Sequence, residues 1–435
     1  MTYLDTDKQT LADLNIVEGI YDEYPLYSLF SSTETKKGKH MMLHWISYPL
    51  SDMSAIQKRQ EAIVWNKLPE LPLDEDELDF IEYYLEYREQ IRKPNALISL
   101  TSVLNRLLRH DAKRYVIERG VVLIIQLLNR LELLRRNLPK DAPSLLKEFA
   151  HSIQYTIYSN ELEEVIKLYQ DEEVHISSYA IDKYDYLFRY TYLEQIRELL
   201  AHIYTLDVCR SAHRIAISKG FCCCPKMTDT TDLSITDFVH PFIRGGRKNN
   251  WKMINGNICF FTGSNMAGKS TTLKAISIAV WLAHCGLPVP ASSMTCPVLE
   301  GIYTSINLPD SLRDGRSHFL AEVLRIKEVL HKAKSGKRCL IILDEMFRGT
   351  NAHDAYDASI TVNKIFKKFP HCLFLISTHI QEYAQYFQND NTCCFYYMDS
   401  QIEKDQFICT HQLLKGISEV KVGYWLVKKE LEDLL

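Results

Sequence analysis

A glycine-rich segment has the residue types and the spacing that bind phosphate groups. It begins at Gly263 and follows the pattern G-x-x-x-x-G-K-S, between an apolar run and a helix-forming run. Glycine lets backbone N–H groups curl around phosphate oxygens, and the start of a helix adds positive potential. The lysine of this pattern reaches the β- and γ-phosphates, and the serine binds Mg²⁺. The pattern therefore predicts a site for ATP and Mg²⁺ formed by Gly263, Ser264, Asn265, Met266, Ala267, Gly268, Lys269, Ser270 and Thr271.

Two further apolar runs lead to polar side chains that could act on a bound triphosphate. One run ends at Asp344 and Glu345, and the other is followed closely by His379. We predict that Asp344 and Ser270 hold Mg²⁺, and that Glu345 polarises the water that attacks the γ-phosphate. His379 could sense the γ-phosphate, although a lone histidine is often an ordinary surface or core residue. The predicted catalytic residues are Glu345, His379 and Lys269.

Ser317 stands just before a run with helical periodicity. Serine is a good N-cap residue, so its role could be purely structural. A serine at the start of a helix can also meet the γ-phosphate of an ATP that is held by a second subunit. The two roles are compatible, and the sequence leaves both open.

The predicted phosphate-binding residues belong to an alternating pattern of elements in residues 238–435. Short apolar runs rich in β-forming residues alternate with helix-forming segments, at 258–262, 302–306, 340–343 and 373–377. This alternation is typical of a mostly parallel sheet with crossover helices. We therefore predict an α/β domain over 238–435, with the polar residues at one edge of its sheet.

Residues 1–237 have the periodicity of helices almost throughout. The acidic residues 74–77 open one such helix. No glycine or proline occurs between Ser144 and Lys219, so that span can hold long helices with short interruptions. Its last part, 179–219, is predicted as one long helix that stops at Gly220. The sequence thus predicts an all-α domain over 1–237.

The composition excludes several classes of protein. Of the 435 residues, 46% are apolar and 24% charged, as in an ordinary globular protein. The formal charge of −4 excludes a globally basic nucleic-acid coat, so any DNA contact must be local. Five of the twelve cysteines form contiguous clusters at 222–224 and 393–394, rather than the spaced pairs of zinc sites. With no apolar run of about 18 residues and no targeting pattern, we predict a cytoplasmic protein with reduced thiols and no membrane partner.

Four short motifs follow one another in the second half of the chain. They are Gly-x-Asn-Met-x-Gly-Lys-Ser-Thr at 263–271, Gly-Arg-Ser-x-Phe at 315–319, Asp-Glu-x-x-Arg-Gly-Thr at 344–350 and Ser-Thr-His at 377–379. In type, order and interval they resemble the ATPase domain of MutS-type DNA mismatch repair proteins. Residues 33–59 are similar to the start of that family's helical core domain.

The resemblance implies a fold and an assembly. The fold would be an ABC-type P-loop NTPase domain with a mostly parallel sheet, preceded by an all-α core and lever domain. The assembly would be a homodimer with composite ATP sites, in which Ser317 contacts the nucleotide bound at Lys269 of the other subunit. ATP binding would close the two ATPase domains, and hydrolysis through Glu345 would reopen them.

The chain also departs from the family's pattern. Full members carry a mismatch-reading domain and a connector before the core, whereas here the core begins near residue 1. The residues Phe80, Ile81 and Glu82 spell the family's Phe-x-Glu wedge, but they lie in an amphipathic pattern and we interpret them as core packing. The family usually has threonine at the position of His318, and glycine at the positions of Phe347 and Ala267. None of these departures removes a predicted catalytic residue.

Two functional hypotheses follow. The first is an ATP-driven DNA-binding protein of mismatch repair or recombination that embraces a junction or a duplex. Its candidate DNA contacts are Arg106, Arg109, Lys113 and Arg114, with Arg119, Arg130, Arg135 and Arg136 as further basic positions; all could equally form a solvated helix surface. The alternative is a nucleotide-switched protein-interaction module without direct DNA binding. A steep loss of DNA affinity with salt would favour the first.

Overall fold

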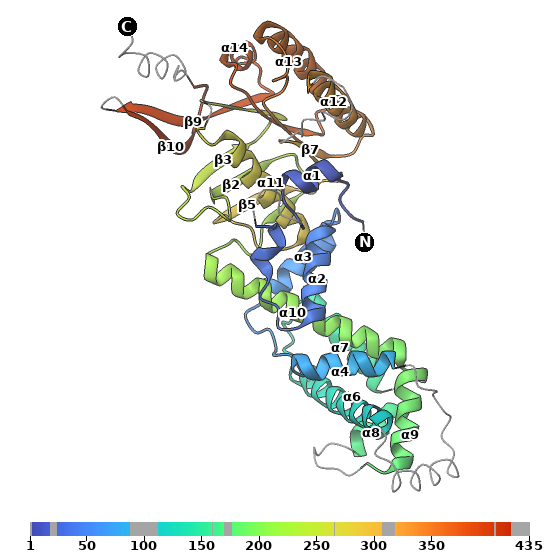
Figure 1. The fold of residues 1–435 in the computed structure, drawn as a ribbon. Coiled ribbons are helices and arrows are strands. Elements are labelled where there is room, and N and C mark those ends of the chain that lie inside the picture. Colours follow the sequence, from blue (N-terminus) through green and yellow to red (C-terminus); the bar gives the residue numbers. More distant parts are fainter. Residues whose placement is uncertain are drawn as a thin grey trace. The chain divides into compact units, whose positions relative to one another are not determined.

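The computed structural model describes residues 2–17, 24–87, 112–158, 160–168, 176–264, 266–306, 318–403 and 406–418 (Figure 1). The chain forms two compact units. The sheet unit comprises Met1–Leu29, Leu43–Gln60 and Arg214–Leu435, and the helical unit comprises Phe30–Met42 and Glu61–His213. Three helices contribute residues to both units: α2 (Lys36–Ser47), α3 (Met53–Val64) and α10 (Leu193–Lys219).

The larger sheet of the sheet unit is mostly parallel. Its strands lie in the order β10-β9-β4-β8-β7-β6, and all neighbours pair in parallel except β10, which is antiparallel to β9. The bounds are β4 (Ile258–Thr262), β6 (Gly301–Ser305), β7 (Cys339–Asp344), β8 (Leu373–Ser377), β9 (Cys393–Glu403) and β10 (Gln406–Lys415). The predicted strands at 258–262 and 373–377 are confirmed, and those at 302–306 and 340–343 are correct to within one residue.

Helices cover this sheet, which explains why β4 and β8 are buried along their whole length. Side chains of α12, α13 and α14 form a core with the strands, including Ile326, Ile360 and Tyr383. Helix α11 packs against β7 and β8 and also contacts the smaller sheet (Figure 1). The helices of this unit are α1 (Lys8–Asp13), α11 (Lys269–Cys285), α12 (His318–Lys334), α13 (Ala352–Phe366) and α14 (Gln381–Tyr386), with a 3₁₀ turn at Leu26–Phe30.

The smaller sheet has the order β1-β5-β2-β3 and mixes parallel and antiparallel pairs. Its strands are β1 (Lys226–Thr228), β2 (Leu233–Phe238), β3 (Asn249–Met253) and β5 (Ser293–Pro297). Because β1 and β2 lie before residue 239, the expectation of helices up to residue 237 is wrong beyond Gly220, where α10 has ended. The domain boundary at 237/238 stays a prediction.

The helical unit contains a large apolar core. Side chains of α4, α6 and α9 meet in it, among them Ile81, Leu127 and Ile181, which are nearly or fully buried. Helix α4 begins with a capping box, in which Asp74 and Glu77 each accept a bond from the other's backbone N–H. Phe80 packs against the core, as predicted. The helices of this unit are α4 (Glu75–Glu86), α6 (Ala112–Asn137), α7 (Ser144–Ile157), α8 (Asn160–Leu168) and α9 (Ser178–Tyr186).

The prediction of one continuous helix at 179–219 is wrong. A π-helical turn at Leu187–Thr191 separates α9 from α10, because the backbone N–H of Tyr192 bonds the carbonyl five residues back. In this turn the buried Arg189 guanidinium donates to Asp185 at 2.6 Å. A terminal nitrogen of the same guanidinium donates to the carbonyl of Tyr87 at 2.8 Å, so this turn also contacts the end of α4.

Each of the twelve cysteines is a free thiol, and Cys209, Cys259, Cys285, Cys296, Cys339 and Cys372 are buried. Among the described ranges, no helix has the length and apolar character needed to cross a bilayer.

Candidate nucleotide site

The glycine-rich loop joins the end of β4 to the start of α11. Two of its glycines have left-handed backbone angles, with φ of 137° at Gly263 and 104° at Gly268. A Cβ at Gly263 would lie 3.1 Å from the backbone oxygen of Met398. Side chains are thus excluded at these two positions, as the spacing pattern requires. The methyl group of Ala267 is fully buried, so the departure at this position is accommodated.

The ammonium group of Lys269 lies under the loop and is almost completely buried. It donates to the carbonyl oxygens of Gly263 (3.0 Å) and Ser264 (3.1 Å), and lies 3.1 Å from Oε1 of Glu345. The carboxylate and the carbonyls compensate the buried positive charge. A phosphate group at the loop would therefore compete with Glu345 for this ammonium.

Asp344, the last residue of β7, lies beside the first turn of α11. The Ser270 hydroxyl donates to Asp344 Oδ2 at 2.6 Å, and the Ser377 hydroxyl donates to the other carboxylate oxygen. Burial raises the pKa of Asp344 above its ordinary value, against the effect of these two hydrogen bonds. The side-chain oxygens of Ser270 and Asp344 thus lie close together, as is expected of two oxygen ligands that bind the same hard cation.

Glu345 follows β7 in a left-handed conformation, with φ of 49°. Its backbone N–H donates to the carbonyl oxygen of Ser377 at 3.1 Å, which fixes the turn against β8. Its carboxylate lies 3.7 Å from His379 Nδ1 and 2.8 Å from an Arg348 nitrogen. His379, together with Lys269 and Arg348, lowers the pKa of Glu345 to about 2. The carboxylate is therefore ionised at neutral pH.

Phe347 adopts a left-handed conformation two residues later, with φ of 66°. Its side chain is only 2% exposed, and its ring centroid lies 5.5 Å from that of Phe319, the second residue of α12. A phenylalanine thus occupies a backbone conformation that favours glycine, and burial of its ring offsets the strain.

The structure brings five of the predicted residues together at the carboxyl ends of β4, β7 and β8: Lys269, Ser270, Asp344, Glu345 and His379. Four predicted residues lie outside the described residues: Asn265, Ser317, Arg106 and Arg109.

The remaining basic candidates for DNA contact lie on α6 in the helical unit. Lys113 is exposed, whereas Arg114 is partly buried and bonds Glu118 at 3.0 Å and also Asp182. Arg130 donates to a backbone carbonyl at 2.8 Å, and Arg135 and Arg136 both bond Glu132. A role in DNA binding stays a prediction for all of these residues.

A cavity of about 450 Å³ opens beside the glycine-rich loop. Met266, Gly268 and Thr271 line it from the loop and α11, and His411 lines it from β10. The His411 ring nitrogen Nδ1 lies 3.2 Å from the carbonyl oxygen of Ala267. Further lining residues include His240, Ile243, Arg247, Asn249 and Thr410.

Sequence reasoning assigned no role to His411 or Arg348. No spacing pattern marks His411, which reaches the loop only because β10 pairs with β9 and β9 with β4. Arg348 contacts Glu345, three residues earlier, through the turn that follows β7. Because this turn is not helical, no helical spacing in the sequence marks the contact.

Two family models match the chain. The model described as MutS domain III matches residues 9–213, and the model described as MutS domain V matches residues 259–430. The second match contains all five of the assembled site residues.

Similar proteins carry the same family name. The DNA mismatch repair protein MutS of Shouchella clausii is 28% identical over 244 residues, which are 54% of this chain and 28% of that protein. The DNA mismatch repair protein msh3 of Botryotinia fuckeliana is 32% identical over 203 residues, 45% of this chain and 18% of that protein. The DNA mismatch repair protein MutS of Granulibacter bethesdensis is 32% identical over 189 residues, which are 41% of this chain and 20% of that protein. The matches thus span less than a third of each relative's length.

Proposed function

The chain belongs to the MutS family of DNA mismatch repair proteins, and from this premise we propose that it binds and hydrolyses ATP with Mg²⁺ and couples hydrolysis to DNA binding. The sheet unit would then be an ABC-type P-loop ATPase domain. The observation that carries the proposal is the meeting of Lys269, Ser270, Asp344 and Glu345 at the ends of parallel strands. This is the edge of an open α/β sheet where ligands bind.

The nucleotide would lie across the loop and the adjoining cavity. Its phosphates would meet the backbone N–H groups of the loop and the start of α11, where the helix adds positive potential. Its base and ribose would occupy the cavity of about 450 Å³, beside His411. A cavity of this size accommodates a nucleoside.

Ser270 and Asp344 would hold Mg²⁺. The two oxygens lie 2.6 Å apart, and hydroxyl and carboxylate oxygens are ligands that Mg²⁺ prefers. The ion would offset charge on the β- and γ-phosphates. Asp344 must be ionised for this role, and a nearby cation would oppose the effect of burial on its pKa.

Glu345 would orient the attacking water and accept its proton. A carboxylate with a pKa of about 2 is a weak base, because Lys269 and His379 stabilise its charge. When nucleotide is bound, the Lys269 ammonium would pair with a phosphate instead of with Glu345. Glu345 would then lose one of the positive charges that lower its pKa, so its basicity would rise. His379, half exposed beside Glu345, would face the γ-phosphate.

DNA binding and dimerisation complete the proposal. The relatives are named as DNA mismatch repair proteins, which supports duplex or junction DNA as the partner. In the proposed homodimer, Ser317 of one subunit would contact nucleotide at Lys269 of the other. The comparisons do not favour a protein-interaction module without DNA binding, because both family models belong to mismatch repair proteins.

ATP titration and steady-state hydrolysis test the nucleotide site. Lys269→Ala should lose ATP affinity by about 100-fold or more, because the ammonium contacts the β- and γ-phosphates. Glu345→Gln should retain binding but hydrolyse ATP about 100-fold or more slowly. Lys252→Ala, an exposed lysine on β3, is the matched control and should behave as wild type. Near-normal ATP affinity of Lys269→Ala would overturn the assignment of the loop.

A further inference from the structure

Two short segments of the sheet unit are rich in positive charge. They are residues 331–338, where α12 ends and the chain enters β7, and residues 364–371, where α13 ends and the chain approaches β8. Together they carry seven lysine and arginine side chains, in a protein whose formal charge is −4. We call these side chains the basic patch: Lys332, Lys334, Lys337, Arg338, Lys364, Lys367 and Lys368.

The fold places the two segments side by side. The His371 ring nitrogen Nε2 lies 3.1 Å from the carbonyl oxygen of Ala333, in the last turn of α12. The Cys372 thiol donates to the carbonyl of Lys337 at 3.4 Å. Both segments precede neighbouring parallel strands, β7 and β8, so they lie at the amino ends of these strands. Asp344 and the rest of the candidate nucleotide site lie at the opposite, carboxyl ends.

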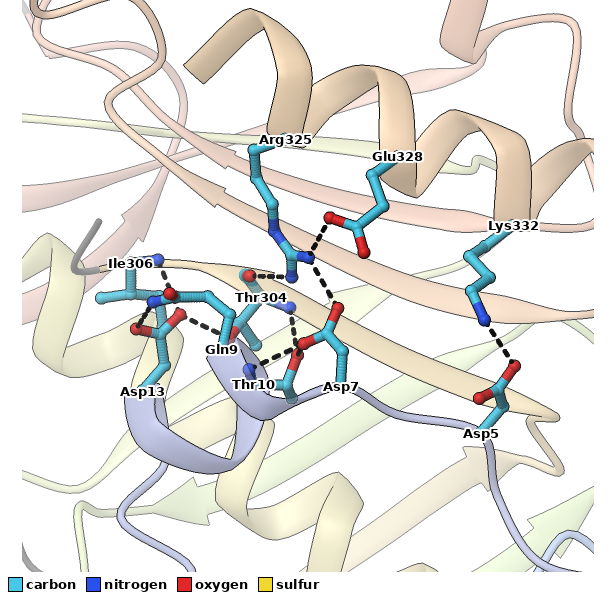
Figure 2. Close-up of polar contacts among 10 residues, drawn as sticks. All are labelled: Asp5, Asp7, Gln9, Thr10, Asp13, Thr304, Ile306, Arg325, Glu328 and Lys332. Carbon is cyan, nitrogen blue, oxygen red and sulfur yellow. Dashed lines mark hydrogen bonds and ion pairs between the residues drawn. The ribbon is translucent and has the colours of Figure 1, made fainter. Parts of the chain in front are cut away.

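Part of the basic patch is paired with carboxylates. Lys332 lies 3.2 Å from the carboxylate of Asp5 (Figure 2), and Lys337 lies 3.6 Å from the same group. The remaining contacts join Arg338 to Asp229 and Glu300, and Lys367 to Asp390. Four carboxylates thus contact four of the seven cations.

Three lysines of the patch have no carboxylate within ion-pair distance among the residues that the structure describes: Lys334, Lys364 and Lys368. All three are exposed, and Lys364 Nζ lies 5.6 Å from the centre of the Tyr386 ring. A helix dipole favours a cation such as Lys334 in the last turn of α12. Lys337 and Lys368 lie beyond the ends of their helices, so the dipole does not account for the whole patch.

The basic residues of α6 that the sequence predicts for DNA contact are engaged differently. Arg114 bonds Asp182, and Arg135 and Arg136 both bond Glu132. An arginine that is held by a carboxylate must give up that partner to bind a phosphate, which offsets the gain. The three lysines of the basic patch that lack a carboxylate lose no such bond.

The side chains around the basic patch favour a nucleic acid over a protein as its partner. Residues 331–338 and 364–371 are all described, and neither segment exposes a large apolar side chain. A protein–protein interface typically centres on aromatic or aliphatic anchors. Phosphate groups, in contrast, are bound by lysine point charges whatever the base sequence.

We propose that the basic patch contacts the phosphate backbone of duplex DNA. This inference rests on the proposed function, in which DNA is the partner, and it assigns a DNA-binding surface to the sheet unit. Nucleotide and DNA would use opposite ends of the same strands, so they would not compete for side chains. Binding at the patch should depend strongly on salt and little on base sequence.

Neutralising the three lysines that lack a carboxylate tests this contact. Lys334→Gln, Lys364→Gln and Lys368→Gln are combined in the Glu345→Gln protein, and perfect duplex DNA is titrated with ATP present. We expect affinity to fall about tenfold or more at about 100 mM salt. The slope of log affinity against log salt should become shallower by about 2–3, because each phosphate contact contributes about 0.9.

Two sets of variants separate the contact from net charge and from folding. The matched control combines Lys219→Gln, Lys226→Gln and Lys252→Gln, which are exposed lysines of the sheet unit outside the patch, and should bind DNA as the parent does. Arginine at the three patch positions keeps the charge and should keep both the affinity and the salt slope. The denaturant midpoint of every variant should match that of the parent, because each substituted side chain is exposed.

Lysine acetylation, measured by mass spectrometry, shows where the DNA lies. A bound phosphate backbone shields the amines that it contacts from an N-hydroxysuccinimide ester. With duplex DNA at about five times its Kd, acetylation of Lys334 and Lys368 should slow about sixfold. Lys226 and Lys252 should react at the same rate with and without DNA.

The possible results distinguish the inference from the proposed function. If the patch variant keeps the affinity and salt slope of the parent, or if DNA does not shield the patch lysines, the inference is wrong, and an acidic protein would better explain the charge. An equal loss of binding in the control variant would show a response to net charge alone and would also contradict it. If Glu345→Gln itself binds no DNA with ATP, the DNA-binding part of the proposed function fails, and the inference fails with it.

Discussion

At the residue scale, Glu345 sets the charge balance of the candidate site. Its carboxylate pairs with Lys269 at 3.1 Å and with Arg348 at 2.8 Å, on a residue that is 9% exposed. The Lys269 ammonium is also the group that we expect to contact the β- and γ-phosphates of a bound nucleotide. In the proposed function, ATP binding would therefore be an exchange of partners at Lys269, in which a phosphate group replaces the Glu345 carboxylate.

This exchange predicts an effect of Glu345 on affinity as well as on rate. Glu345→Gln removes the competing charge, so a non-hydrolysable ATP analogue should bind on the order of fivefold more tightly than to wild type, equivalent to about 1 kcal/mol. Arg348→Gln is a suitable comparison, because Arg348 contacts the same carboxylate but not Lys269. Calorimetric titration measures both constants. Equal or weaker binding by Glu345→Gln would show that the pair does not compete with nucleotide.

The same residue predicts a dependence of stability on pH. The pKa of Glu345 is about 2 in the folded protein, against an ordinary value of 4.5. Because the folded value is depressed, its contribution to stability is present above about pH 4.5 and is lost as the pH falls toward 2. The free energy of unfolding of wild type should therefore fall more steeply than that of Glu345→Gln in this window, by up to about 1.4 kcal/mol per pH unit.

Denaturant unfolding at a series of pH values between about 6 and 3 provides the measurement. The informative quantity is the difference between wild type and Glu345→Gln, because the other carboxylates titrate in both proteins. Parallel curves for the two proteins would mean that Glu345 is not held in its charged form by His379 and Lys269.

At the element scale, the turn after β7 is held by an aromatic contact with α12. Phe347 has a φ of 66° and packs against Phe319. Loss of the ring should cost about 3 kcal/mol in the free energy of unfolding. The backbone conformation, however, should make Phe347→Gly more stable than Phe347→Ala by about 1–2 kcal/mol, because only glycine is relaxed there.

Phe374 in the buried strand β8 is the control for this prediction. At that position we expect Phe374→Ala to be more stable than Phe374→Gly by about 0.5–1 kcal/mol, because glycine destabilises a strand relative to alanine. Denaturant unfolding of the four variants measures the two differences. If alanine is also preferred at position 347, the turn is not strained in the way its backbone angle indicates.

The elements differ in how well the sequence predicts them. Buried parallel strands such as β4 and β8 consist of continuous β-forming apolar residues, so their positions can be predicted from the local sequence alone. The residues 344, 345 and 379 could be placed together for the same reason, since each follows such a strand. Two helices of the sheet unit were also predicted: the glycine-rich loop marks the start of α11, and apolar periodicity after Ser317 indicates α12.

The missed features depend on contacts between distant residues. The π-helical turn carries Arg189, which donates to the carbonyl of Tyr87, 102 residues away, and helical periodicity contains no sign of this contact. His411 lines the cavity through strand pairing across the sheet edge. The N-terminal residues 5–13 include three aspartates with no marked spacing, and only the fold brings Asp13 to Thr304, 291 residues away.

At the scale of the whole molecule, the central claim is that ATP controls DNA binding. Each supporting observation concerns one part of the chain: the assembled residues of the sheet unit, and the family matches of residues 9–213 and 259–430. A protein of net charge −4 must bind DNA through a local basic surface. Binding should then be strongly salt-dependent, because phosphate contacts release counterions.

The most direct test is the binding of purified Glu345→Gln to mismatched duplex, perfect duplex, four-way junction and single strand, with and without ATP, over a salt series. The account predicts ATP-dependent binding to a duplex or a junction that weakens by about 10³-fold between about 50 and 200 mM salt, if six or more phosphates are contacted. Lys269→Ala should show no effect of ATP. No binding to any of these DNAs, with wild-type ATP hydrolysis intact, would contradict it.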